Sequence, residues 1–79
     1  MSKEEILKII IENLLDVIPE IASEDITRSD SLKDLGANSI DRADIIEMTL
    51  ESLSLNIPLT ELGAAGNIGE LVDLFHAKV

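Results

Sequence analysis

The 79-residue sequence contains no cysteine, tryptophan or tyrosine, and Phe75 is its only aromatic residue. Without cysteine, the chain has no disulfide bonds and no thiolate nucleophile of its own, which fits a reducing compartment such as the cytoplasm. His76 is the only histidine, so neither a serine–histidine hydrolase pair nor a zinc site has the groups it needs. A glycine-rich phosphate loop with its lysine is also missing. These absences argue against a stand-alone enzyme and against a metal site.

Basic residues are scarce as well. Six Lys and Arg residues stand against sixteen Asp and Glu residues, which gives a formal net charge of −10. Such a charge repels nucleic acids and anionic lipid and attracts basic protein surfaces, so we expect no nucleic acid and no membrane as a partner. No apolar run is long enough to cross a bilayer, and the N-terminus has no signal-peptide pattern. Because 46% of the residues are hydrophobic, the chain buries a small core, and we expect one domain over residues 1–79, a monomer in the cytoplasm.

Apolar residues recur at helical spacing in several segments of the chain. The pattern predicts helices over residues 3–18, 39–53 and 68–77 and a short helical turn over residues 61–63. Each begins beside a residue that caps helix N-termini well: Ser2, Asn38, Thr60 and Asn67. For three of them an acidic residue three positions on completes a capping box: Glu5, Asp41 and Glu70. Pro19 ends the first helix, and residues 19–38 form a long connection. Four side chains are placed to pin it to the core: Ile21, Ile26, Leu32 and Leu35. The prediction is an all-α fold, a small four-helix bundle with a long first loop and a short third helix.

The predicted helix over residues 39–53 has two distinct faces. At about 100° per residue, its core stripe is Ala43, Ile46, Leu50 and Leu53, and its acidic face is Asp41, Asp44, Glu47 and Glu51. Ile40 and Met48 fall inside the acidic sector. Clustered acids are often only a solvated face, but apolar residues among them also suit a docking surface that steers a basic partner. Arg42 interrupts this face. It is a plain surface arginine, a partner for Asp41 or Glu61, or a contact for another protein.

Ser39 follows a small turn that contains Gly36 and ends at the capping residue Asn38. The serine therefore lies in the first helical turn, beside unpaired N–H groups and the positive end of the helix dipole. That position favours a negative group, including a phosphate ester on the serine oxygen. Since Ala37 is small, another protein has room to approach the hydroxyl. The simpler alternative is that Ser39 only helps to start the helix.

The run Gly36-Ala37-Asn38-Ser39-Ile40 resembles the Gly-x-Asp-Ser-hydrophobic motif of acyl carrier proteins, and the likeness extends over nearly the whole chain. It implies a four-helix bundle of that type, a carrier rather than an enzyme. It also implies that a phosphopantetheinyl transferase attaches 4′-phosphopantetheine covalently to Ser39 from coenzyme A. Asn38 departs from the usual Asp, so no carboxylate is present there during attachment. The helix after the serine docks onto enzymes in this family, which points to Ile40, Asp41, Arg42, Asp44, Glu47, Met48 and Glu51.

A longer stretch, residues 36–45 followed by 51–58, is similar to the stand-alone carriers of bacterial polyketide β-branching cassettes. This likeness implies a donor that receives malonyl, holds it after conversion to acetyl and delivers it to a hydroxymethylglutaryl (HMG)-synthase-like enzyme. An acyltransferase and a decarboxylating ketosynthase-like enzyme are the other implied partners. In carrier proteins a short third helix lies beside the cofactor arm, and the glycine-flanked run 63–66 is a candidate to open for an acyl chain. Two alternatives stay open: a carrier for fatty-acid, peptidyl or D-alanyl transfer, and an unmodified acidic helical adaptor.

Overall fold

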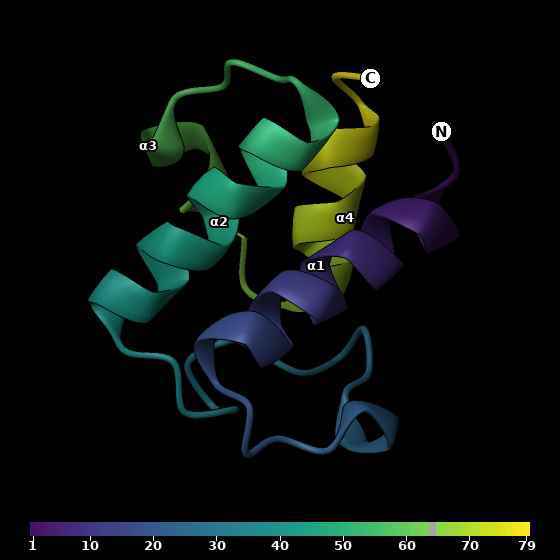
Figure 1. The fold of residues 1–79 in the computed structure, drawn as a ribbon. Helices are drawn as coiled ribbons and strands as arrows, with labels where there is room; N and C mark the ends of the chain where they lie inside the picture. Colours follow the sequence, from purple (N-terminus) through teal and green to yellow (C-terminus); the bar gives the residue numbers. More distant parts are fainter. Residues whose placement is uncertain (64) are drawn as a thin grey trace.

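The computed structural model describes residues 1–63 and 65–79. Within those ranges the chain forms helices and no strand: α1 Lys3–Val17, the 3-10 turn η1 Ser23–Asp25, α2 Ser39–Leu53, α3 Leu59–Leu62 and α4 Ile68–His76. Helix α1 packs against both α2 and α4, and α2 also contacts α3. Figure 1 shows the long connection between α1 and α2 at one end of the bundle and both chain termini toward the other. The predicted all-α fold with its long first loop and short third helix is confirmed.

Capping boxes start the two long helices, as predicted. At α1, the Ser2 hydroxyl accepts a hydrogen bond from the Glu5 N–H at 3.1 Å, and the Glu5 carboxylate accepts one from the Ser2 N–H at 3.4 Å. At α2, the Asn38 side-chain oxygen accepts from the Asp41 N–H at 2.8 Å, while the Asp41 carboxylate accepts from the Asn38 N–H at 3.3 Å. Each box satisfies N–H groups that have no partner inside the helix.

The two later helices begin differently from the prediction. Helix α3 starts at Leu59, with Pro58 at its N-cap, and Thr60 lies inside the helix without capping it. Proline suits a helix start because its ring presets φ and the missing N–H is not needed there. At α4, Asn67 accepts from the Glu70 N–H at 2.8 Å as predicted, but the Glu70 carboxylate accepts from the Gly66 N–H at 2.6 Å. The Glu70 carboxylate therefore bonds to the residue before the N-cap rather than to the N-cap residue itself. Asn67, the N-cap residue, has an extended backbone with φ −152°.

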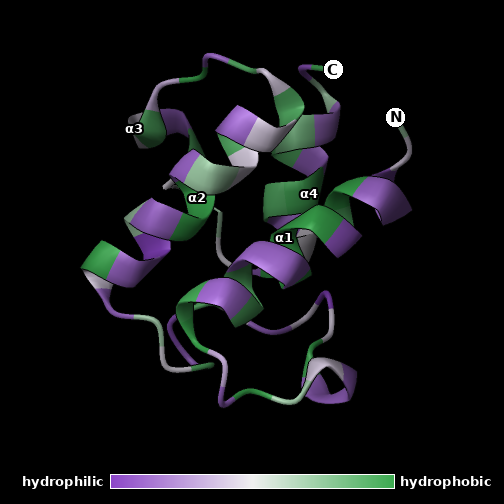
Figure 2. Cartoon of the chain, viewed as in Figure 1, coloured by the Kyte–Doolittle hydropathy of each residue, from purple (hydrophilic) through white to green (hydrophobic). Residues whose placement is uncertain are grey.

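The core forms where α1, α2, α4 and the long connection meet. On α1 and α4 the buried residues recur at helical spacing, as the sequence pattern predicts: Ile6, Ile10, Leu14, Ile68, Leu71, Val72 and Phe75. The connection is pinned as expected: Ile26 and Leu32 are buried, and Ile21 and Leu35 pack against the core. Figure 2 shows hydrophobic residues on the sides that the helices turn toward one another and hydrophilic residues mainly outside.

Helix α2 buries a different stripe from the one predicted. Its fully buried residues are Ile45 and Thr49, whereas the expected core stripe is only partly buried: Ala43, Ile46, Leu50 and Leu53. Thr49 tolerates burial because its hydroxyl donates to the Ile45 carbonyl at 2.8 Å and accepts from the Asn13 side-chain amide at 3.0 Å. A buried polar group that is fully hydrogen-bonded carries little penalty. The predicted stripe lies one position away from the buried one, because threonine counts as polar in a hydropathy pattern.

The long connection is also bonded to the start of α4. The Ile68 N–H donates to the Asp30 carbonyl at 2.9 Å, and the Gly69 N–H donates to the Arg28 carbonyl at 2.8 Å. A Cβ atom at Gly69 would lie 3.1 Å from the Arg28 carbonyl oxygen, a tight contact, so glycine eases this close approach. These contacts hold residues 28–30 of the connection against the start of α4.

Candidate functional site

Ser39 is the first residue of α2 and is exposed. The turn before it is fixed to the bundle: Gly36 adopts φ +104°, which favours glycine, and the Ala37 N–H donates to the Leu32 carbonyl at 3.0 Å. Ala37 is buried, at 2% exposure. The structure therefore presents the Ser39 hydroxyl at the surface from a rigid support, at the positive end of α2.

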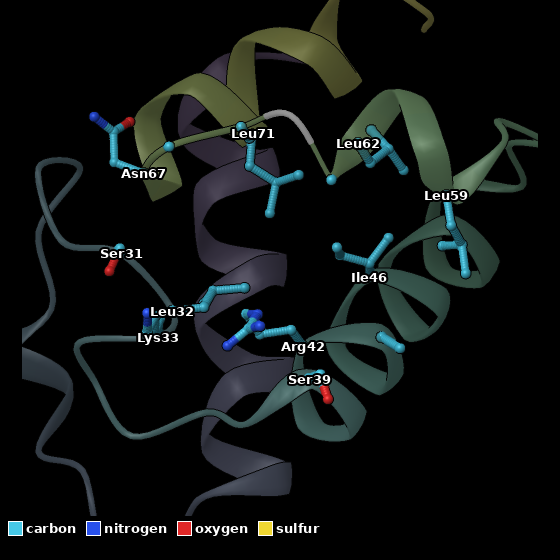
Figure 3. Close-up of a pocket in the computed structure, with 14 residues that line it drawn as sticks. Ser31, Leu32, Lys33, Ser39, Arg42, Ile46, Leu59, Leu62, Asn67 and Leu71 are labelled. Carbon is cyan, nitrogen blue, oxygen red and sulfur yellow. The ribbon is translucent and has the colours of Figure 1, made fainter.

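A pocket of about 490 Å³ lies beside Ser39, between α2, α3, the start of α4 and the long connection. Figure 3 shows leucine and isoleucine side chains around it and Ser39 at its edge, with the hydroxyl directed away from the pocket. Its apolar lining includes Leu32, Ile46, Leu59, Leu62 and Leu71. The sequence by itself leaves open whether an acyl cavity forms, and in the structure this pocket lies between the second and third helices. The predicted opening of the run 63–66 involves Ala64, which lies outside the described residues, and stays a prediction.

Arg42 does not form the ion pairs considered from the sequence. Its guanidinium donates to the Ala37 carbonyl at 2.8 Å, and among the described residues the single salt bridge joins Lys3 and Asp73 at 2.9 Å. Asp41 is engaged instead by the Asn38 N–H in the capping box. Arg42 thus ties the first turn of α2 to the turn that precedes Ser39.

The predicted docking residues share α2 with Ser39 but differ in exposure. Ile40 is 71% exposed, and Asp44, Glu47 and Glu51 are exposed as well. The remaining three, Asp41, Arg42 and Met48, are partly buried. The outer side of α2 is therefore an acidic surface with an exposed isoleucine next to the serine, and its role in docking stays a prediction.

Sequence reasoning missed several residues around the pocket. Ser31, Lys33 and Asn67 line it although they belong to the connection and to the cap of α4. The sequence feature that could have pointed to these residues is Lys33, one of only six basic residues in the chain. It stands three positions before Gly36, close to the serine. No cluster of His, Asp or Glu suited to a metal ion is found in residues 1–63 and 65–79. None of the helices described has the length and hydrophobicity to span a bilayer.

The family model described as "Phosphopantetheine attachment site" matches residues 5–75. This chain belongs to the acyl carrier protein family. The carrier is 46% identical over 79 residues to the polyketide biosynthesis acyl-carrier-protein AcpK of Bacillus subtilis (strain 168), covering 100% of this chain and 96% of the relative. It is 38% identical over 63 residues to hispidin synthase of Neonothopanus nambi, covering 80% of this chain and 4% of that protein.

A solved structure is similar over nearly the entire carrier. The match has a TM-score of 0.92 and 54% sequence identity and covers 99% of this chain and 100% of the other. That structure is the crystal structure of the curacin biosynthetic pathway HMG synthase in complex with acetyl donor-ACP. The agreement shows that the carrier has the acyl-carrier fold, as the sequence resemblance implied.

Family membership establishes the chemistry of the carrier. Members bear 4′-phosphopantetheine covalently and hold acyl groups on it as thioesters, so this protein is a carrier rather than an enzyme. The site near Ser39 fits such a group on structural grounds. An exposed hydroxyl at a helix N-terminus accepts a phosphodiester, and a partly apolar pocket lies next to it.

Proposed function

We propose that Ser39 bears the phosphopantetheine arm and that this carrier donates acetyl to an HMG-synthase-like enzyme in polyketide β-branching. The main support is the 54% identity, over 99% of this chain, to a carrier solved as the acetyl donor in complex with an HMG synthase. The likeness to AcpK, named for polyketide biosynthesis, points the same way.

In the priming step, a phosphopantetheinyl transferase joins the Ser39 oxygen to the phosphorus that carries pantetheine in coenzyme A. The serine loses its proton, a phosphodiester forms, and adenosine 3′,5′-bisphosphate leaves. Asn38 caps α2 with its amide oxygen and offers no carboxylate to take that proton. Because coenzyme A is a cytoplasmic metabolite, we place this step in the cytoplasm.

An acyltransferase then loads malonyl on the thiol, and a decarboxylating ketosynthase-like enzyme removes carbon dioxide to leave acetyl. The acidic side of α2 meets a basic surface of each enzyme, with Ile40 as an apolar contact. The arm raises the effective concentration of acetyl at whichever enzyme is docked. A charged surface suits this exchange, because it speeds encounter and is weakened by water and salt.

Intact mass spectrometry tests the attachment. With coenzyme A and a transferase of broad specificity, the mass should rise by one phosphopantetheine. Ser39→Ala should abolish the rise while circular dichroism stays unchanged. Ser52→Ala is the matched control, since this exposed serine at the other end of α2 bonds only to the Met48 carbonyl at 2.9 Å among the described residues. A protein that gains no mass, or gains it after Ser39→Ala, would contradict the assignment and favour the adaptor alternative.

Acetyl transfer tests the donor role. The carrier, loaded with labelled acetyl, is mixed with an HMG-synthase-like enzyme, and label on the synthase is measured. Transfer should be rapid and should need the holo form. A primed carrier that fails to acylate the synthase, but serves fatty-acid, peptidyl or D-alanyl enzymes, would place the protein in another pathway.

A further inference from the structure

The pocket beside Ser39 has a charge opposite to that of the chain. The sequence holds sixteen acidic and six basic residues. Among the described residues that line the pocket, however, the charged ones are Lys33 and Arg42, and none is Asp or Glu. Ion pairs inside the protein do not explain the two cations at the pocket, because neither forms a salt bridge with a described residue. Two cations in the lining of a largely apolar pocket suit an anion that lies against it.

Arg42 lines the pocket and has more hydrogen-bond donors than its contact with Ala37 uses. Its guanidinium donates one hydrogen bond to the Ala37 carbonyl at 2.8 Å, and a guanidinium has five N–H donors in a rigid plane. Ser39 lies three residues earlier on α2, and residues at this spacing are neighbours on a helix surface. Figure 3 shows the Arg42 side chain extending from α2 toward the segment with Leu32 and Lys33.

We propose that Arg42 and Lys33 bind the phosphodiester of the arm on Ser39 and so direct the arm over the apolar pocket. This inference rests on the proposed attachment at Ser39. The serine is exposed, so rotation about its own side-chain bonds turns a phosphate from the outward direction toward Arg42. The N-terminus of α2 adds to the attraction.

The arm carries an apolar group close to its anionic phosphate, and the pocket lining combines two cations with apolar side chains. In 4′-phosphopantetheine one CH2 group separates the phosphate ester oxygen from a carbon that bears two methyl groups. In the pocket, the two cations are accompanied by Ile46, Leu59 and Leu62. An arm held by its phosphate therefore places its dimethyl group against these side chains, which shields apolar surface from water.

Nuclear magnetic resonance of apo and fully primed protein tests the proposal. The samples are the unsubstituted protein, Arg42→Gln, Lys33→Gln and the control Lys8→Gln, which removes an equal charge from an exposed position on α1. Priming should shift the Arg42 side-chain N–H signal and the Ile46 and Leu62 methyl signals. Arg42→Gln should abolish the methyl shifts and move the phosphorus resonance, Lys33→Gln should reduce the methyl shifts, and Lys8→Gln should change neither.

Further measurements separate phosphate binding from support of the turn. Arg42→Lys keeps the charge and should retain part of the methyl shifts, and in the unsubstituted protein these shifts should shrink as salt rises. The Arg42→Gln apo spectrum shows whether loss of the Ala37 bond alone disturbs the turn. If priming is complete by mass but the pocket and Arg42 signals do not move, or Lys8→Gln equals Arg42→Gln, the proposal is wrong while the attachment stands. If no mass is gained, both fail.

Discussion

Helices α1 and α2 are each 15 residues long, start with a capping box and pack against each other, yet they divide their surfaces differently. Helix α1 buries Ile6, Ile10 and Leu14 completely and carries polar residues on the opposite side. Helix α2 buries only Ile45 and Thr49, one of which is polar. It leaves Ile40 71% exposed.

The missing burial on α2 reflects several simultaneous tasks. Ala43 and Ile46 line the pocket, Arg42 holds the turn before the serine, and the acidic residues face outward. A helix that contributes to a core, a pocket and an outer surface cannot keep one wide apolar stripe. The comparison teaches that α1 uses its inner side for burial alone, whereas α2 gives up burial for residues that line a pocket, hold a turn or face outward.

The largest expected effect concerns the core of α1. Ile10→Ala should lower the free energy of unfolding by about 2–5 kcal/mol, because it removes buried methyl groups and leaves a cavity. Ile40→Ala on α2 should change it by no more than about 0.5 kcal/mol, since that side chain is in water. Urea unfolding measures both. Similar losses of unfolding free energy at the two positions would contradict the difference in burial between the helices.

Charge reversal on the two helices should separate function from stability. Asp44→Lys with Glu47→Lys should slow acetyl transfer to the synthase at least about tenfold, equivalent to about 1.4 kcal/mol, because it removes attraction to a basic surface. The matched control, Glu12→Lys with Asp16→Lys, makes the same charge change on exposed positions of α1. It should leave transfer nearly unchanged. Equal rates for the two double variants would remove the docking role of α2.

The capping residues provide a smaller test. Ser2→Ala and Asn38→Ala should each cost about 1 kcal/mol, since each removes a side-chain acceptor from its capping box. Asn38→Asp should keep stability within a few tenths of a kcal/mol, because Asp caps as well as Asn. Thermal unfolding measures the three, and mass spectrometry follows priming of the Asn38 variants. Faster priming of Asn38→Asp would show that a carboxylate there assists attachment.

The smallest effect is expected at the ion pair between α1 and α4. Lys3 and Asp73 approach to 2.9 Å, but their side chains are 48% and 59% exposed. Lys3→Gln should therefore lower stability by less than about 0.5 kcal/mol, and added salt should erase the difference. Urea unfolding at two salt concentrations measures this. A loss as large as that of a capping residue would show that α1 relies on charge as well as burial.

Local sequence signals determined much of this carrier. Helix ends were predicted to within a residue or two from Ser2, Pro19, Asn38 and Asn67, because capping residues and proline act through neighbouring backbone groups. The spacing of apolar residues located the cores of α1 and α4. The motif around Ser39 gave the family, which the comparisons confirm.

Tertiary packing alone decided which side of α2 faces the core. It buried Thr49 through the Asn13 amide, a partner 36 residues away. It also gave Arg42 the Ala37 carbonyl in place of an acid, and it set Lys33 beside the same pocket as Ser39. Sequence periodicity describes one helix by itself. The burial of Thr49 and the contacts of Arg42 and Lys33 depend instead on groups from other segments of the chain, which supply hydrogen bonds and cover one side of α2. Only the packed chain brings those groups together.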